Sequence, residues 1–312
     1  VFRIPFVTTN AVTTPAVSIQ GLTKRYGKLT AVNKLNLEAD SGQILGFLGL
    51  NGAGKTTTIR ILLDLLRPSE GTASILGFDC QKQSLQARAL VGYLPGELGV
   101  YLDLTGREVL NLLARLGSRP LNEKYRNEVQ ERFEFRDKDL RRKLREYSTG
   151  MKRKLGLLQA LESDPPLLIL DEPTEGLDPV TQESFYELLS DLKTRGRTVF
   201  MSSHVLSEVA RVCDRVALLR AGQLALLSSV EEIRKLAPRR VRVLFAEDVE
   251  LDDSLPSGYQ ILEVKPRVWT LAVESKLGAL LKFLAPLPVQ DVELEEPQLE
   301  DVLIKYYRDD AS

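Results

Sequence analysis

The stretch Gly49-Leu-Asn-Gly-Ala-Gly-Lys-Thr56 decides the fold, because it fits the pattern G-x-x-x-x-G-K-[ST]. It follows the apolar run Gln43–Leu48, which predicts a buried strand, and it precedes a predicted helix over Lys55–Leu66. Glycines let backbone N–H groups close around phosphate oxygens, and the N-terminus of a helix adds favourable partial positive charge. The strand–turn–helix context therefore predicts a phosphate-binding loop, or P-loop.

This loop assigns roles to particular side chains. Lys55 is expected to reach the β- and γ-phosphates of a bound nucleotide, and the Thr56 hydroxyl is expected to ligate Mg²⁺. The predicted nucleotide-binding residues of the loop and of the helix that follows are Gly49, Asn51, Gly52, Ala53, Gly54, Lys55, Thr56 and Thr57.

A second acidic motif lies further along the chain, where the apolar run Leu167–Leu170 is followed by Asp171 and Glu172. An apolar strand that ends in aspartate is typical of the Walker B motif, in which the carboxylate holds Mg²⁺ directly or through water. A carboxylate immediately after it can act as the general base for an attacking water. The alternative is a strand that ends in solvated acids, which the P-loop in the same chain disfavours.

Around these motifs, short apolar runs alternate with helical stretches and predict a mostly parallel, covered sheet. The segment 96–164 is richer in helix formers and predicts a helical insert, closed by Pro165-Pro166. After Walker B, the pattern predicts a helix over 180–193, a strand at Thr198–Ser202, a helix beginning at Val205 and a hairpin of Val216–Leu219 with Gln223–Leu227. A last helix would carry a capping box of Ser228 and Glu231.

The segment Pro238-Arg239-Arg240 marks a boundary, beyond which the pattern predicts a small α+β unit. Its predicted elements are strands at Val241–Ala246, Tyr259–Val264, Arg267–Val273 and Val289–Glu293, with helices at Lys276–Leu284 and Gln298–Tyr307. We therefore expect a flexible leader over 1–16, a nucleotide-binding domain over 17–237 and an accessory domain over 238–312.

Composition excludes several other classes. Of 312 residues, 42 are Lys or Arg and 43 are Asp or Glu, so the formal net charge is −1 and no nucleic-acid partner is expected. Cys80 and Cys213 are the two cysteines, and neither has a Cys or His at metal-ligand spacing, which argues against a disulfide scaffold or a zinc site. No stretch reaches the roughly 18 apolar residues of a membrane span, and residues 1–15 lack the apolar run of a signal peptide.

From about Val17 to Lys235 the chain resembles the nucleotide-binding subunits of ATP-binding cassette (ABC) transporters. In that family a helical subdomain with a signature loop follows Walker A. The run Tyr147-Ser-Thr-Gly-Met151 occupies the signature position, where only Ser148 and Gly150 keep the family pattern LSGGQ. Alone, Ser148 would be read as a helix N-cap. The resemblance implies that Ser148, with the N–H groups of Thr149 and Gly150, binds the γ-phosphate of ATP held by another subunit.

Further positions carry the same resemblance. His204 is the single histidine of the chain and matches the family's switch histidine, which contacts the γ-phosphate and positions Glu172 and water. Asp178, in the run Gly176–Pro179, matches the D-loop that joins the two sites of a dimer. Tyr26 matches the aromatic residue that stacks on adenine. From the residues alone, a lone histidine is more often structural and a single tyrosine can be a surface residue.

Two departures from the family pattern stand out. Leu50 replaces the usual proline of the P-loop, which is expected to change loop rigidity more than chemistry. The family's Q-loop glutamine, which contacts Mg²⁺ and water and senses the membrane partner, would fall at Gly96. Glu97, one position later, is a candidate substitute through its side-chain oxygen, so hydrolysis is expected to survive while coupling through the Q-loop stays open.

The resemblance implies an α/β, P-loop (RecA-like) ABC cassette with a helical subdomain, which binds ATP and Mg²⁺ and hydrolyses ATP. It further implies head-to-tail dimerisation with a second, like nucleotide-binding subunit. Transport would pass through separate integral membrane permease subunits, with the ATPase in the cytoplasm at the inner face of the cell membrane. The end of the chain, Pro297–Tyr307, resembles bacterial exporter ATPases and favours export. The alternative is an ABC ATPase that acts on ribosomes, nucleic acid or assembly complexes. One cassette and no heptad stretch count against that alternative. The cargo and a paralogous partner stay open.

Overall fold

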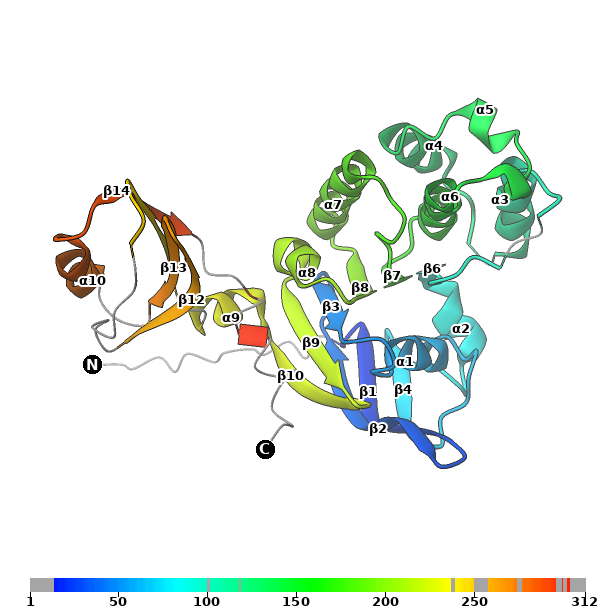
Figure 1. Ribbon diagram of the computed structural model, residues 1–312. Helices are drawn as coiled ribbons and strands as arrows, with labels where there is room; N and C mark the ends of the chain where they lie inside the picture. Colours follow the sequence, from blue (N-terminus) through cyan, green and yellow to red (C-terminus); the bar gives the residue numbers. More distant parts are fainter. Residues whose placement is uncertain are drawn as a thin grey trace, which may run out of the picture. The chain divides into compact units, whose positions relative to one another are not determined.

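The computed structural model describes residues 14–99, 102–117, 119–236, 239–249, 258–273, 277–295, 299 and 302–303 (Figure 1). The chain divides into two compact units, residues 1–227 and 228–312. The predicted leader over 1–16 lies almost wholly outside the described residues. The predicted domain boundary after residue 237 also falls outside them, so it stays a prediction.

A six-stranded sheet forms the centre of the first unit, with the strand order β10-β9-β3-β8-β7-β6. Its strands are β3 (Ile44–Leu48), β6 (Val91–Leu94), β7 (Leu167–Asp171), β8 (Thr198–Ser203), β9 (Arg215–Arg220) and β10 (Gln223–Ser229). From β9 to β6 the neighbouring strands run parallel. Every residue of β3, β7 and β8 is buried, as expected of strands covered on both faces. The predicted parallel sheet is thereby confirmed.

The amino-terminal strands depart from this prediction because they form a separate antiparallel sheet, in the order β2-β1-β4-β5. Its strands are β1 (Val17–Tyr26), β2 (Leu29–Ala39), β4 (Glu70–Ile75) and β5 (Phe78–Asp79). Only Gly27 and Lys28 separate β1 from β2, and a connection this short allows antiparallel pairing alone. Glycine suits that turn because its φ is +58°.

Helix α1 (Lys55–Leu62) lies between the two sheets, whereas α7 (Pro179–Thr194) and α8 (Leu206–Val212) lie on the other face of the central sheet (Figure 1). One apolar core joins α1 to both sheets through residues such as Ile59, Phe47 and Ile19. The bounds of α7, β8, α8 and the β9–β10 hairpin confirm the elements predicted after the Walker B motif.

The prediction that α1 continues to Leu66 is wrong, because the helix ends at Leu62. Asp64 adopts a left-handed backbone with φ of +55°, which a continuing helix excludes. The N–H groups of Leu65 and Leu66 turn back to the carbonyl of Arg60, at 2.9 and 3.2 Å. The helix therefore closes on its own last turn before Pro68 is reached.

The segment 96–164 contains the helices expected from its composition. They are α3 (Gly106–Leu116), α4 (Glu123–Arg132), α5 (Asp137–Leu140), the short 3₁₀ helix η1 (Leu144–Glu146) and α6 (Thr149–Leu161), and α2 (Ser84–Ala89) precedes them. Side chains cap the starts of three of these helices: Thr105 with Glu108 for α3, Asn122 for α4 and Ser148 for α6. Local sequence thus fixes where these helices begin.

The second unit is a four-stranded antiparallel sheet in the order β12-β13-β11-β14. Its elements are α9 (Val230–Leu236), β11 (Arg239–Phe245), β12 (Tyr259–Lys265), β13 (Val268–Val273), α10 (Leu277–Leu284) and β14 (Val289–Glu295). Trp269 and Phe245 pack edge to face in its core, with ring centroids 4.6 Å apart. These strands and α10 confirm the prediction, while the predicted helix Gln298–Tyr307 lies largely outside the described residues.

The predicted capping box at Ser228 and Glu231 is wrong by one position. Ser229 Oγ accepts the N–H of Glu232, at 3.1 Å, and the Glu232 carboxylate accepts the N–H of Ser229, at 3.0 Å. Glu231 instead forms an ion pair with Lys235, one helical turn later.

Among the residues described, no helix has both the length and the apolar character needed to cross a membrane.

Candidate nucleotide-binding and hydrolysis site

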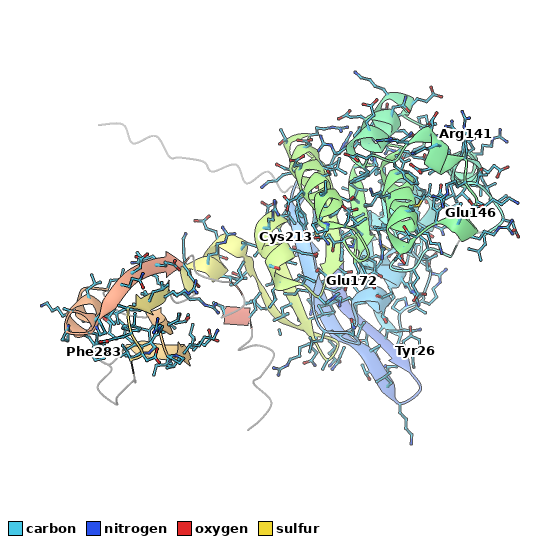
Figure 2. The ribbon with its side chains drawn as sticks, turned by 45° about the horizontal axis from the view of Figure 1, so that its top comes forward. Tyr26, Arg141, Glu146, Glu172, Cys213 and Phe283 are labelled. Carbon is cyan, nitrogen blue, oxygen red and sulfur yellow. The ribbon has the colours of Figure 1, made fainter. Side chains whose placement is uncertain are left out.

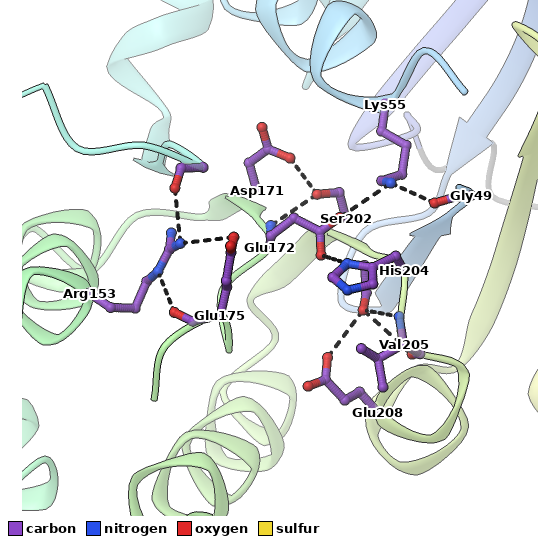
Figure 3. Close-up of polar contacts among 12 residues, drawn as sticks. Gly49, Lys55, Arg153, Asp171, Glu172, Glu175, Ser202, His204, Val205 and Glu208 are labelled. Atoms are coloured by element: carbon purple, nitrogen blue, oxygen red, sulfur yellow. Dashed lines mark hydrogen bonds and ion pairs between the residues drawn. The ribbon is translucent and has the colours of Figure 1, made fainter. Parts of the chain in front are cut away.

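The carboxyl ends of three neighbouring parallel strands bring the predicted catalytic groups together (Figure 3). The P-loop follows β3, Asp171 ends β7, and His204 follows β8, which lies between the other two strands. The register places Asp171 opposite Ser202. Parallel pairing therefore gathers residues from distant parts of the sequence at one edge of the sheet, where ligands of open α/β sheets bind.

Glycines shape the P-loop where no side chain would fit. Gly54 is the N-cap of α1 in a left-handed conformation, with φ of +106°, and a Cβ there would lie 2.5 Å from the carbonyl oxygen of Ala31. No side chain caps the start of α1, and its first turn carries no acidic residue. The first N–H groups of α1 are therefore available to an anion. Gly49, Gly52 and Ala53 complete the turn, and Asn51 and Thr56 are exposed beside it.

Lys55 is 6% exposed and is held by two groups at the P-loop. Its Nζ donates to the carbonyl oxygen of Gly49 at 2.6 Å and lies 3.2 Å from Oε1 of Glu172. The ammonium group therefore stands between the predicted phosphate cradle and the predicted general base. A phosphate entering the loop would compete for it with both partners.

Glu172 connects the Walker B motif to the P-loop, through Lys55, and also contacts His204. Its Oε2 lies 2.8 Å from Nδ1 of His204, the geometry of an imidazole N–H donating to a carboxylate. Its backbone is left-handed, with φ of +51°, and its N–H donates to Ser202 Oγ at 3.0 Å. The left-handed backbone turns Glu172 out of the line of β7, and its carboxylate lies beside Lys55 of the P-loop.

Ser202 is a site residue that the sequence analysis missed. It is fully buried, and its hydroxyl donates to Oδ1 of Asp171 at 2.5 Å while accepting the N–H of Glu172. One hydroxyl thus fixes both acids of the Walker B motif. The available signal was a small polar residue near the end of an otherwise apolar strand, but only the pairing of β7 with β8 shows which residue it faces.

The oxygen ligands expected for Mg²⁺ share one cavity. Thr56, Gly96 and Asp171 line a cavity of about 690 Å³, which Thr149 also borders. In the part of the chain that is described, no three His, Cys, Asp or Glu residues cluster closely enough to hold a metal ion by themselves. One carboxylate and one hydroxyl nevertheless fit Mg²⁺, which is usually bound by one or two protein oxygens together with phosphate oxygens and water.

The signature run and the D-loop meet within the chain. Ser148 Oγ accepts the N–H of Met151 at 3.2 Å, which confirms its N-cap role, and both Ser148 and Thr149 are exposed. A Cβ at Gly150 would lie 2.8 Å from the Gly176 carbonyl oxygen, so the two loops pack backbone to backbone. Asp178 caps α7 through Thr181, and these hydrogen bonds hold the pKa of Asp178 below its usual range.

Four other predicted residues lie around this site. Tyr26 stands at the end of β1, in the β1–β2 hairpin, and is 46% exposed (Figure 2). Leu50 in the P-loop and Glu97 after β6 are both exposed. Thr57 is half-buried in the first turn of α1. The stacking role of Tyr26 stays a prediction.

Comparison with known proteins agrees with this geometry. The family model "ABC transporter" matches residues 32–175. The bacitracin transport ATP-binding protein BcrA of Enterococcus faecalis is 37% identical over 222 residues, covering 70% of this chain and 71% of that protein. The Nod factor export ATP-binding protein I of Rhizobium johnstonii is 33% identical, covering 93% and 94%.

A solved structure described as the ATP-binding subunit of an ABC transporter matches the fold. Its TM-score is 0.66 at 28% sequence identity, and the match covers 71% of this chain and 92% of that one. The P-loop, the paired acids of β7 and the histidine after β8 are therefore set in a known architecture. The chain belongs to the ATP-binding subunits of ABC transporters, and it is an ATPase of that family.

Proposed function

We propose that this ATPase pairs head to tail with a second, like subunit and powers export through separate membrane-spanning permease subunits. The observation that carries the proposal is the convergence of Lys55, Glu172 and His204 at the P-loop. Support for export comes from the relative named for Nod factor export, which matches along nearly the whole chain. The ATPase would lie in the cytoplasm, peripheral on the inner face of the cell membrane.

Hydrolysis follows from how the side chains are held. Glu172 is placed to accept a proton from a water attacking the γ-phosphate, and His204 orients the carboxylate through Nδ1. Lys55 exchanges its Gly49 and Glu172 contacts for phosphate oxygens, so its charge and the N–H groups at the start of α1 stabilise the negative charge of the transition state. Freed of the ammonium group, the carboxylate is available as a base.

Asp171 and Thr56 are the residues that would hold Mg²⁺. The carboxylate of Asp171 is buried and kept in place by Ser202, whereas Thr56 is exposed at the first turn of α1. When bound, the cation would neutralise part of the charge on the nucleotide phosphates. Ser202 therefore contributes by fixing the orientation of one ligand before the nucleotide arrives.

The exposed start of α6 supports the dimer. Ser148 and Thr149 present a helix N-terminus at the surface, and in a single chain the Ser148 hydroxyl only caps its own helix. If a second subunit placed its P-loop there, the ATP bound to that P-loop would be enclosed between the two chains. The N–H groups at the start of α6 would then lie near its γ-phosphate. Engagement and release of the dimer would then move the permease helices.

The test is to recover a tagged Glu172→Gln variant, in the presence of ATP, from membranes of the source organism in mild detergent. This variant is expected to bind ATP and hydrolyse it slowly, which prolongs the engaged state. Mass spectrometry should find a polytopic membrane protein at about one copy per ATPase chain. Recovery in the soluble fraction alone, with ribosomal or nucleic-acid partners, would contradict transport and leave the ATPase chemistry intact. Glu175→Gln, a nearby exposed acid, is the matched control.

A further inference from the structure

Arg153 is a buried arginine that lies on α6, just after the signature run, and it is 5% exposed (Figure 3). Its guanidinium donates to three backbone carbonyl oxygens: Nη1 to Pro95 at 3.0 Å, Nη2 to Gly96 at 2.9 Å and Nε to Glu175 at 3.1 Å. The Glu175 carboxylate lies 3.6 Å from Nη2. One side chain thus joins the signature helix, the loop after β6 and the loop after Walker B.

The loop held by Arg153 lies against the Walker B aspartate. A Cβ on Gly96 would be 3.4 Å from Oδ2 of Asp171, and both residues line the cavity in which Thr56 lies. Gly96 has no side chain with which to reach that carboxylate. The approach of this loop to Asp171 therefore depends on its backbone, and Arg153 is what holds that backbone through two adjacent carbonyls.

The guanidinium group suits this work in a way that an ammonium group does not. Its planar fork spreads N–H donors over three nitrogens and can reach separate carbonyl oxygens at once, whereas lysine carries its donors on a single nitrogen. Burial lowers the pKa of Arg153, while the carboxylates of Glu175, Asp171 and Glu172 act against that change. An arginine stays protonated in proteins, so a positive charge is retained close to the two acids of the motif.

We propose that Arg153 is a positioning residue for hydrolysis, which holds the backbone of Pro95 and Gly96 against Asp171 and so sets the geometry of the cation site. In this role it acts through the backbone of the loop that it holds. The inference rests on the proposed Mg²⁺ site. It predicts that loss of the guanidinium bonds to the loop weakens cation binding and slows turnover before it weakens ATP binding.

The test compares Arg153→Lys with the wild-type chain in two measurements. The first is steady-state hydrolysis as a function of ATP and of Mg²⁺. The second is equilibrium binding of Mn²⁺ to the ATP complex, followed by electron paramagnetic resonance in a Glu172→Gln background, which needs no turnover. Loss of a group that orients a metal ligand typically weakens metal binding 10- to 100-fold, so we expect about a tenfold weaker Mn²⁺ affinity and about a tenfold lower kcat.

Two matched variants separate positioning from general stability. Arg132→Lys makes the same change on α4, where the arginine joins the helical segment to Asp191 of α7, away from the loop. Glu175→Ala removes the ion pair of Arg153 and keeps all three carbonyl bonds. Both should keep Mn²⁺ affinity and kcat within about twofold of wild type, since neither releases the loop.

Wild-type Mn²⁺ affinity and kcat in Arg153→Lys would overturn the proposal, as would an equal loss in Arg132→Lys. If the lysine variant does not fold, Arg153→Gln provides the same comparison, because its uncharged amide has two N–H donors and cannot bond all three carbonyls at once. Hydrolysis by the wild-type chain that proceeds equally well without any divalent cation would overturn the Mg²⁺ site itself. That result is distinguishable, because it requires no variant.

Discussion

Nδ1 of His204 lies 2.8 Å from Oε2 of Glu172. The other oxygen of the same carboxylate faces Lys55, at 3.2 Å, so the proposed general base stands between the histidine and the P-loop. The backbone N–H of Glu172 donates to Ser202 Oγ, which fixes the position of the residue. His204 and Lys55 therefore hold the carboxylate directly, and Ser202 holds the backbone of the same residue.

Removing the histidine should leave a base that is present and poorly oriented. For His204→Ala we expect kcat to fall by about 10- to 100-fold, with KM for ATP little changed, because orientation matters most in the transition state. Steady-state hydrolysis measures both quantities. His204→Gln retains a donor of similar reach and should recover part of the loss. An unchanged kcat in His204→Ala would show that this contact is dispensable.

Ser202→Ala should damage the same site through Asp171 and Glu172. The loss leaves the buried carboxylate of Asp171 and the N–H of Glu172 without their shared partner, at a cost of about 1–3 kcal/mol. We expect a lower melting temperature and a Mg²⁺ requirement about tenfold higher. Ser203→Ala is the control, since that hydroxyl bonds Val205 and Glu208 instead. An equal Mg²⁺ dependence in the two variants would contradict the role of Ser202.

Much of the fold follows from local sequence signals, and the exceptions have physical causes. The parallel strands read as continuous apolar runs because both faces are covered. The pairing of β1 with β4 depends on tertiary structure and is encoded by no periodicity, because β2, β3 and α1 lie between them in the chain. The end of α1 depends on the left-handed backbone of Asp64. Aspartate can adopt this conformation, but an aspartate in the sequence does not require it.

The site divides in the same way. Fixed spacing predicts Lys55 and Thr56 directly, whereas the predicted roles of Glu172 and His204 depend on their order after the P-loop. Ser202 and Arg153 act through contacts between residues about 31 and 57 positions apart, for which the sequence carries no periodic signal. Such residues are visible only once strand register and the packing of α6 are known.

Glu162 should make stability depend on pH in an unusual direction. It is buried at the end of α6, 3.7 Å from Arg126, and burial raises its pKa to about 7. Because the folded state then holds a proton more tightly than the unfolded state, this group stabilises the fold most below about pH 4.5 and loses that contribution as pH rises toward 7. Glu162→Gln should flatten the change in melting temperature between pH 5 and 8.

The matched variant for that experiment is Glu128→Gln, which removes an exposed carboxylate from α4. It should retain the wild-type pH dependence of the melting temperature. The size expected for Glu162 is about 1–3 kcal/mol across the interval, since one pKa unit corresponds to about 1.4 kcal/mol. A wild-type slope in Glu162→Gln would show that this carboxyl titrates normally in the folded chain.

The two cysteines should be unreactive in the folded protein. Both are buried, and burial raises the pKa of the Cys80 thiol to about 12 and raises that of Cys213 as well. Cys213 also packs against β3, where a Cβ on Gly46 would lie 2.9 Å from its sulfur. Titration with a thiol reagent at pH 8 should find both thiols in denaturant and none before unfolding. Rapid labelling of the native chain would contradict this.

The measurement that tests the account most directly is ATP turnover by Glu172→Gln, with ATP binding measured in parallel. A positioned general base contributes about 10²- to 10⁴-fold to a rate, so kcat should fall at least about 100-fold. The affinity for ATP should be retained, because Lys55 and the start of α1 are intact. Hydrolysis near the wild-type rate would contradict the assignment of Glu172 as the base, and with it the chemistry derived from this site.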